Sequence, residues 1–341
     1  MDSAGFHIEA EAVQKAGAYF AEEETAFIPL VSFESGVYAW MQRGQRYVLK
    51  LTSRQRRTEA EILGEIDFVR FAAEQGIPVA GAVLSRHGRY VEAVGDEGPE
   101  GYWAYAFEWA EGEEIKAQDW GPELYRIWGR TTGELHRVTC LYRPSSPEWT
   151  RCRWDEEELY LAGLSAISEI PDVQMAAEPV LRRLRQAPEH AQQFGLIHHD
   201  LHHRNFHLHQ GKLVVFDFDG LVHHHFASDI AIALYYALAW HSSEKDKTLF
   251  AERFLQHFLE GYAEARTVSG ELLQGLPDWM LLRHMLLYAS HLRNWEGSSL
   301  NTMQRWTLNR YRTDLAKGTL FGGIDFGRLG FQSQEGGLQR Q

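Results

Sequence analysis

Residues 196–219 of the chain read LIHHDLHHRNFHLHQGKLVVFDFD. From residue 206 onward, apolar residues alternate with histidines, which is the periodicity of a β-strand. Gln210-Gly211 follows where a two-residue hairpin loop would lie, and glycine tolerates the positive φ that such loops need. The apolar run 213–216 predicts the second strand. We therefore expect a short β-hairpin here.

Three oxygen-bearing side chains lie near the open end of this hairpin. Counting outward from the turn, Asn205 falls almost opposite Asp217, and Asp200 lies in the loop just before. Cross-strand neighbours have Cβ atoms about 4.5–5.5 Å apart, so an amide oxygen and a carboxylate should converge. Mg²⁺ usually takes one or two carboxylates together with phosphate oxygens and water. The spacing therefore predicts a magnesium and phosphate site at positions 200, 205 and 217.

The motif also carries a family resemblance. His-x-Asp, an asparagine five residues after the aspartate, and a strand ending in Phe-Asp-Phe-Asp together resemble the aminoglycoside phosphotransferase/choline kinase superfamily more than the eukaryotic protein kinases. The resemblance implies an α+β, two-lobed protein-kinase-like fold with ATP and Mg²⁺ as cofactors. It implies that Asp200 accepts or orients the substrate hydroxyl, that Asn205 and Asp217 hold the metal, and that His198 is a structural member of the loop.

Other polar residues around the motif leave alternatives open. Asp219 either assists the metal or is merely solvated, whereas Asp229 is expected to cap a helix that begins at Ile230. The many histidines suggest zinc, which needs three or four converging ligands. However, His207 and His209 point the same way from one strand, and no separated Cys or His-Glu-x-x-His motif supports them. The kinase-like interpretation is preferred.

A lysine upstream is the candidate for binding nucleotide. Lys50 lies in an otherwise apolar strand, so its ammonium must reach a partner or solvent. On the following helix Glu61 and Glu65 are geometric rivals for that partner. The superfamily pairs such a lysine with a helix glutamate that precedes a Gly-[Val/Ile]-Pro-Val segment, here residues 76–79. The resemblance therefore favours a Lys50–Glu65 pair.

The segment before this strand takes the place of a phosphate-covering loop. Ser35 and Gly36 are the candidates for phosphate contact, although the segment matches neither GxGxxG nor the Walker A pattern. Residues 105–112 resemble a hinge that binds adenine through backbone groups.

The pattern of expected elements divides the chain. Residues 1–108 are expected to form a small, β-rich nucleotide-binding lobe with one long helix at 55–75, 109–330 a larger, mainly helical catalytic and substrate-binding lobe, and 331–341 a disordered tail. The strands expected in the first lobe are 37–40, 47–51, 82–84, 89–93 and 102–109. The helices expected in the second are 122–137, 155–164, 176–186, 229–240, 249–265 and 279–295.

Composition narrows the class of protein. The 341 residues carry a formal charge of −13, which argues against nucleic acid and does not favour an anionic membrane, but permits a cationic substrate. Two cysteines imply no disulfide framework and a reducing compartment. The start lacks the layout of a signal peptide, and the longest apolar run, 230–240, is too short to span a bilayer. A cytoplasmic location is expected.

The expected activity is ATP-dependent phosphoryl transfer to a hydroxyl of a small molecule such as an amino alcohol, an aminoglycoside or a homoserine-like compound. Aromatic residues and arginines of helix 279–295, Arg283 and Arg293 among them, are candidates for binding it, or are ordinary core and surface. A bacterial stress-response Ser/Thr protein kinase is one alternative. A catalytically silent, spore-coat-like binding protein is another, but the filled catalytic positions weigh against it. The oligomeric state stays open.

Overall fold

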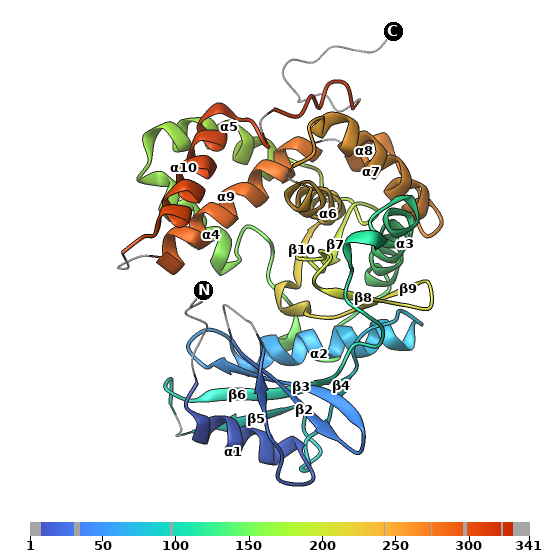
Figure 1. The fold of residues 1–341 in the computed structure, drawn as a ribbon, viewed down its shortest axis with the longest axis vertical. Helices are drawn as coiled ribbons and strands as arrows, with labels where there is room; N and C mark the ends of the chain where they lie inside the picture. The colour runs from blue at the N-terminus through green and yellow to red at the C-terminus, as the bar shows by residue number, and fades with distance from the viewer. Residues whose placement is uncertain are drawn as a thin grey trace. The chain divides into compact units, whose positions relative to one another are not determined.

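The computed structural model describes residues 8–329 except 31–34, 96–97, 242, 274, 296–298 and 322. The chain divides into two compact units (Figure 1). The first contains the chain up to Glu113 together with Tyr142–Arg151 and Phe206–Asp219, and the second contains the remainder. The expected boundary between residues 108 and 109 stays a prediction, and the expected tail lies outside the described residues.

An antiparallel sheet forms the centre of the first unit. Its strands run in the order β1-β2-β3-β6-β4, and β5 also pairs with β6. The strands expected at 37–40 and 47–51 are confirmed as β2 and β3, which form a hairpin with a turn at Arg43-Gly44, where both φ angles are positive, at 49° and 79°. The strands are β1 Ile28–Pro29, β2 Gly36–Gln42, β3 Gln45–Ser53, β4 Ala82–Val83, β5 Val91–Val94 and β6 Tyr102–Glu108.

Helices α1 (Ala10–Phe20) and α2 (Glu59–Glu74) cover opposite faces of this sheet (Figure 1). Helix α1 was not expected; it buries Phe20 against Trp40 and Leu49. Helix α2 begins later than the expected residue 55, because Thr58 forms a capping box with Glu61 and so fixes the first turn. The turn that this leaves between β3 and α2 contains Arg57.

The hairpin predicted from the motif is also confirmed. Strand β8 (Phe206–His209) pairs with β9 (Lys212–Val215), with Phe206 opposite Val215. Gln210 and Gly211 have φ values of 48° and 75°, as a two-residue hairpin turn with two positive φ angles requires. Backbone bonds tie the hairpin into the first unit: the amide of Ala80 donates to Val215 at 3.0 Å.

The second unit is mainly helical. Its helices are α3 Pro122–Thr139, α4 Glu158–Ser168, α5 Pro171–Arg185, α6 Phe226–Trp240, α7 Lys247–Ala263, α8 Gly270–Leu273, α9 Leu276–Trp295 and α10 Thr302–Lys317. Helix α10 and a short antiparallel pair, β7 (Phe194–Ile197) with β10 (Val222–His225), were not expected. Short 3₁₀ turns lie at Ala117–Asp119, Pro147–Trp149 and Phe218–Gly220.

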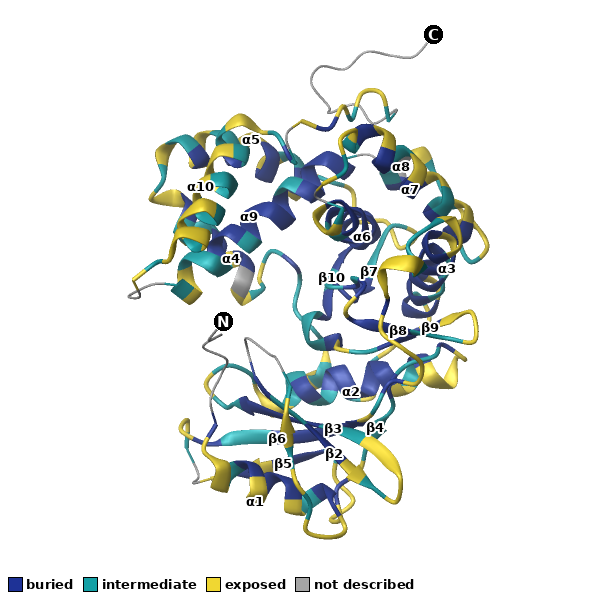
Figure 2. Cartoon of the chain, viewed as in Figure 1, coloured by how far each residue is buried: buried dark blue, intermediate teal, exposed yellow. Residues whose placement is uncertain are grey.

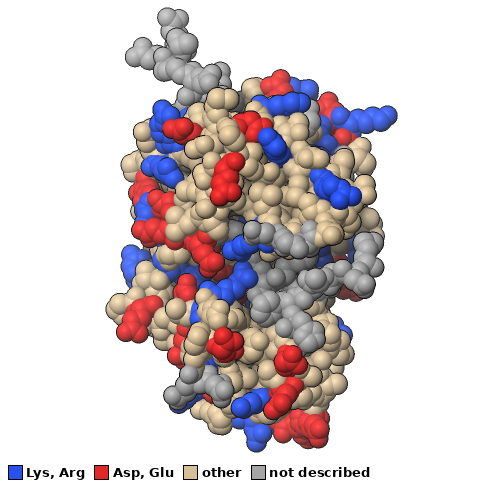
Figure 3. Space-filling model, turned by 90° about the vertical axis from the view of Figure 1, so that its left-hand side faces the viewer, with Lys and Arg blue, Asp and Glu red and all other residues tan. Residues whose placement is uncertain are grey.

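Helix α6 is buried along most of its length (Figure 2). Helices α3 and α7 pack closely because Gly129 and Gly261 lack side chains: a Cβ at Gly129 would lie 1.7 Å from the Phe258 carbonyl oxygen. None of the described helices is long and apolar enough to cross a membrane. On the face drawn in Figure 3, basic and acidic side chains are interspersed, so that face carries no single acidic field.

Candidate active site

The loop that follows β7 is held by a buried carboxylate. The backbone amides of His198 and His199 donate to Asp229 at 3.2 and 2.8 Å, and His136 Nε2 lies 3.1 Å from the same carboxylate. Burial would raise the pKa of Asp229, but the bond to His136 and the neighbouring imidazoles lower it. Asp229 therefore stays ionised and fixes the loop.

This role corrects the expectation that Asp229 caps a helix. Helix α6 begins four residues before Ile230, at Phe226, so Asp229 lies inside its first turn and is 1% exposed. The sequence did contain a signal for this role, because Asp229 is the lone carboxylate in an otherwise apolar run. A buried acid must find hydrogen-bond donors.

The structure brings Asp200 and Asn205 together. The Asn205 side-chain amide donates to the Asp200 carbonyl oxygen at 2.9 Å and to its carboxylate at 3.2 Å. With the amide nitrogen so engaged, its oxygen is the atom that suits a metal. Asn205 is 6% exposed, which fixes its orientation.

Arg283 is the residue that sequence reasoning placed differently. It was a candidate for binding the small-molecule substrate, but its Nη2 donates to Asp200 Oδ1 and, at 2.7 Å, to the Tyr236 hydroxyl. Burial alone would raise the pKa of Asp200, but the Arg283 guanidinium outweighs it and lowers that pKa. Asp200 is thus an ionised, oriented carboxylate.

Most of the other candidates on α9 are core residues. Trp279, His284 and Tyr288 are each less than 5% exposed. Trp279 packs against His225 with ring centroids 4.8 Å apart, and Tyr235 contacts His284 Nδ1 at 2.7 Å. These contacts favour the plain structural interpretation of this helix.

The lysine of the first unit has two carboxylate partners. Lys50 is 5% exposed, and its Nζ donates to Asp217 Oδ1 at 2.8 Å and to Asp219 Oδ1 at 2.6 Å. The predicted Lys50–Glu65 pair is not formed: Glu65 Oε2 accepts from Arg57 Nη1 at 2.8 Å instead. Arg57 reaches Glu65 from the segment just before α2, a contact over eight positions that the family resemblance does not reveal.

Asp217 and Asp219 suit a divalent cation. Both carboxylates contact the Lys50 ammonium, so two oxygen ligands already surround one positive charge. The Asp217 side chain is 45% exposed. Mg²⁺ needs no more protein carboxylates than these. The non-glycine φ of 64° at Asp217 marks a constrained backbone of the kind found at functional sites. Asp219 is an ion-pair member, so it is not merely solvated.

Asp217 belongs to the first unit and Asp200 and Asn205 to the second. Their predicted meeting around one metal therefore stays a prediction. So do the phosphate contacts of Ser35 and Gly36. Ser35 is buried, and a Cβ at Gly36 would lie 2.4 Å from Ile8, so this glycine makes room for core packing.

Within the described ranges no three His, Cys, Asp or Glu side chains converge as a zinc site requires. Single histidines have other partners. His207 contacts the Ala110 carbonyl oxygen at 2.8 Å, and His224 stacks on Trp154 with centroids 4.9 Å apart. These contacts account for the positions of the His207 and His224 rings.

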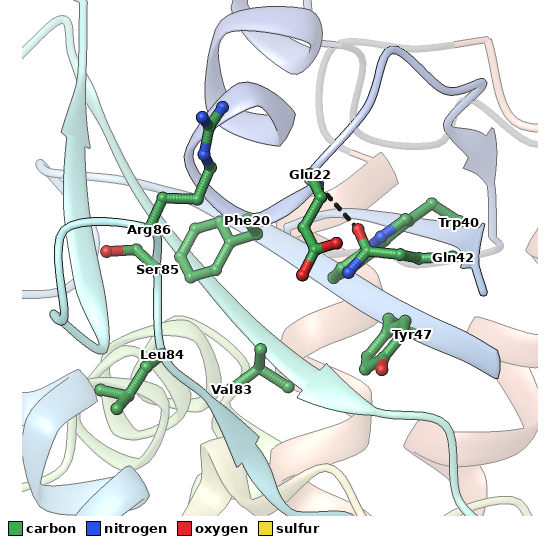
Figure 4. A pocket seen from close by; sticks show the side chains of 9 residues that line it. All are labelled: Phe20, Glu22, Trp40, Gln42, Tyr47, Val83, Leu84, Ser85 and Arg86. Atoms are coloured by element: carbon green, nitrogen blue, oxygen red, sulfur yellow. Dashed lines mark hydrogen bonds between the residues drawn. The ribbon is translucent and has the colours of Figure 1, made fainter.

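A cavity of about 260 Å³ lies in the first unit (Figure 4). Its lining includes Trp40, Gln42 and Tyr47, and the Glu22 amide donates to Gln42 Oε1 at 2.8 Å across it. Tyr47 and Lys50 lie on opposite faces of β3, because side chains alternate along a strand. The cavity is therefore on the α1 face and is not the place of the charged cluster.

Comparisons with known proteins identify the family. The family model described as "Phosphotransferase enzyme family" matches residues 30–268. The amicoumacin kinase of Bacillus subtilis (strain 168) is 34% identical over 331 residues, covering 95% of this chain and 96% of the relative.

Solved structures are similar over most of the chain. An amicoumacin kinase in complex with AMP-PNP, Ca²⁺ and Ami is 33% identical with a TM-score of 0.86, covering 94% of this chain and 97% of that one. A microcompartment-associated aminopropanol kinase, 19% identical with a TM-score of 0.66 over 91% and 95% of the two chains, shares the fold. The chain therefore belongs to the phosphotransferase enzyme family and has its kinase-like fold.

Proposed function

We propose that the chain is an ATP- and Mg²⁺-dependent kinase that transfers the γ-phosphoryl group to a hydroxyl of a small molecule, and that amicoumacin or a molecule resembling it is the acceptor. The observation that carries the proposal is the 34% identity to an amicoumacin kinase along 95% of the chain. The arrangement of charged side chains supports it independently.

Asp200 is proposed to orient the acceptor. Its Oδ1 accepts from Arg283, whereas Oδ2 accepts from the Asn205 amide at 3.2 Å and keeps a second lone pair. Oδ2 is thus the oxygen that would accept the hydroxyl hydrogen and take the proton as phosphorus–oxygen bond formation proceeds. Asp229 fixes the loop through hydrogen bonds to its backbone amides. The Asp200 carboxylate is therefore held in place before substrate binds. Phosphoryl transfer gains most from such positioning and from charge stabilisation.

Lys50 is proposed to serve the nucleotide phosphates. A bound Mg²⁺ would be held by Asn205 and Asp217 and would neutralise charge on the phosphate oxygens. An ammonium has three N–H donors, and the bonds to Asp217 and Asp219 use two of them. The third suits a phosphate oxygen.

An acceptor screen tests the proposal. Labelled ATP and Mg²⁺ are offered with amicoumacin, aminoglycosides, amino alcohols, homoserine and mixed proteins, each with the wild-type chain and with Asp200→Ala. We expect label on amicoumacin with the wild-type chain alone. Label only on protein would favour a protein kinase, and no transfer to any acceptor would favour a binding protein; either result contradicts the proposal.

A further inference from the structure

The part of helix α6 that reaches solvent is mainly aromatic. Of residues 226–240, only Tyr236, Ala239 and Trp240 are not buried. Their spacing of three and four positions puts them on one face of the helix, with Cβ atoms about 5–6 Å apart. Trp240 is 50% exposed. A single exposed ring is ordinary on a protein surface, so the neighbours of Trp240 decide what it means.

Trp240 belongs to a row of packed rings, which we call the aromatic band and which consists of Trp120, His202, His203, Tyr236 and Trp240. Trp240 lies nearly parallel to Trp120, at 13° with ring centroids 5.9 Å apart. His203 packs against both, with its centroid 4.6 Å from Trp240 and 5.2 Å from Trp120. The His202 centroid lies 5.9 Å from His203 and 4.4 Å from Tyr236. All five residues belong to the second unit, and none lies on α9.

The aromatic band begins at the candidate catalytic carboxylate. His202 Nε2 lies 3.5 Å from Asp200 Oδ2. The Tyr236 hydroxyl accepts from Arg283 at 2.7 Å, and the same guanidinium donates to Asp200. Trp240 follows one helical turn after Tyr236 on the same face of α6. A molecule with its hydroxyl at Asp200 would therefore reach Trp240 with a group one to two helical turns away, or roughly 5–11 Å.

Polar atoms of the band lack partners. Trp120 Nε1 and both ring nitrogens of His203 are buried and have no hydrogen-bond partner among the described residues. Proteins pair nearly all of their buried polar atoms, so each exception asks for a reason. A flat ring with oxygen substituents can stack on Trp240 with its face and offer acceptors to N–H groups at its edge.

We propose that the aromatic band binds a flat, unsaturated ring system of the acceptor while the acceptor hydroxyl lies at Asp200. Offset or edge-to-face contact between aromatic rings raises affinity by up to about tenfold beyond the burial of apolar area. An ammonium group held by cation–π contact is the competing occupant, and it needs no flat ring. The inference rests on the proposed function, because it assumes that Asp200 orients an acceptor hydroxyl.

Three matched acceptors test the band: aminopropanol, its phenyl-substituted analogue and its cyclohexyl-substituted analogue. With the wild-type chain, we expect kcat/KM for the phenyl compound to exceed that for aminopropanol by about tenfold or more, and that for the cyclohexyl compound by about threefold. Trp240→Leu stays apolar but loses the flat ring, so it should reduce the phenyl preference to about threefold or less, chiefly by raising KM. Trp240→Phe should keep most of the preference. Trp306→Leu removes a tryptophan of α10 that is 55% exposed, and as the matched control it should keep the full preference.

The same comparison is available where a compound is a poor acceptor, because its inhibition constant against amicoumacin replaces kcat/KM. Three results would overturn the inference: no phenyl preference in the wild-type chain, a cyclohexyl compound as good as the phenyl one, or a preference that survives Trp240→Leu. An aminoglycoside that loses as much as the phenyl compound in Trp240→Leu would assign the band to ammonium groups and would also overturn it. Transfer to no small molecule, amicoumacin included, would instead refute the proposed function, and the inference with it.

Discussion

The two units hold their candidate catalytic and metal-binding carboxylates in different ways. In the second unit Asp200 has a single guanidinium partner, Arg283, and lies on a loop fixed by backbone bonds to Asp229. In the first unit Asp217 and Asp219 share the cations Lys50 and Arg57. One carboxylate has a single cation beside it on a loop held by backbone bonds, whereas the others share two buried cations.

The difference reflects what surrounds each acid. Burial and the Arg283 charge together lower the pKa of His199, beside Asp200, to about 4, so at neutral pH this histidine adds no positive charge. Arg283 then has the largest effect in lowering the pKa of Asp200. In the first unit burial lowers the pKa of Lys50, but Asp217 and Asp219 more than reverse this and raise it well above its usual value. Lys50 therefore stays protonated, and an anionic ligand can compete with the two carboxylates for its ammonium.

The largest expected effects come from the two carboxylates themselves. Asp200→Ala should lower kcat about 10³-fold or more, since the oriented oxygen is lost, while Mg·ATP affinity stays within about twofold. Asp217→Ala should weaken nucleotide binding by about tenfold or more in Mg²⁺ and far less in EDTA. Transfer assays and calorimetry on both variants measure the contrast.

Two results would break this contrast between the units. The first is an Asp200→Ala variant that loses Mg·ATP affinity as strongly as it loses turnover. The second is an Asp217→Ala variant with undiminished affinity for Mg·ATP. Either would show that the two carboxylates do not have the separate roles assigned to them.

A smaller effect is expected at Arg283. Arg283→Met should lower kcat about 10²-fold near neutral pH, because Asp200 loses the group that lowers its pKa. Its pKa then rises, so the acid limb of the kcat profile moves to higher pH and activity recovers partly as pH increases. Arg283→Lys should keep the limb near its wild-type position, and Tyr236→Phe should cost only a few-fold. An unmoved acid limb in Arg283→Met would show that the arginine only supports packing.

Local patterns explain which parts of the structure could be predicted. The hairpin turn at Gln210-Gly211 follows from strand alternation and a glycine, and the strand containing Lys50 follows from its apolar neighbours. Both depend on residues that are close in the sequence. Helices α1 and α10 were missed, and the first buries only part of its surface against the sheet.

The partners of the charged residues could not be predicted in the same way. Arg57 and Asp219 are 162 positions apart, and Arg283 and Asp200 are 83 apart. Several acids and bases in the sequence satisfy the same charge rule, so only three-dimensional packing selects among them. The family resemblance favoured Lys50–Glu65, but Arg57 occupies that glutamate. A resemblance can therefore identify the participants of a site without identifying their pairs.

The smallest expected effect is on stability at acid pH, where a histidine of the second unit can be compared with an aspartate of the first. His203 packs on Trp240 with ring centroids 4.6 Å apart, and burial lowers its pKa to about 4. Neither ring nitrogen has a hydrogen-bond partner in the described part of the chain. Because the unfolded histidine titrates near pH 6.5, the unfolded chain binds more protons between pH 6.5 and 4. This contribution to stability is complete above pH 6.5 and is lost as the pH falls toward 4.

Replacing His203 by phenylalanine keeps the ring and removes the titration. Between pH 7 and 4.5 the unfolding free energy of the wild-type chain should fall. That of the variant should fall by about 1–2 kcal/mol less, allowing for partial solvent screening. Denaturant unfolding at the two pH values measures this difference.

In the first unit, Lys50 and Arg57 outweigh burial and lower the pKa of Asp219. The contribution of Asp219 to stability is therefore lost only below the ordinary aspartate range. Hydrogen exchange at pH 5 should therefore show the second unit opening before the first, and equal protection of both would mean that the histidines do not govern acid stability.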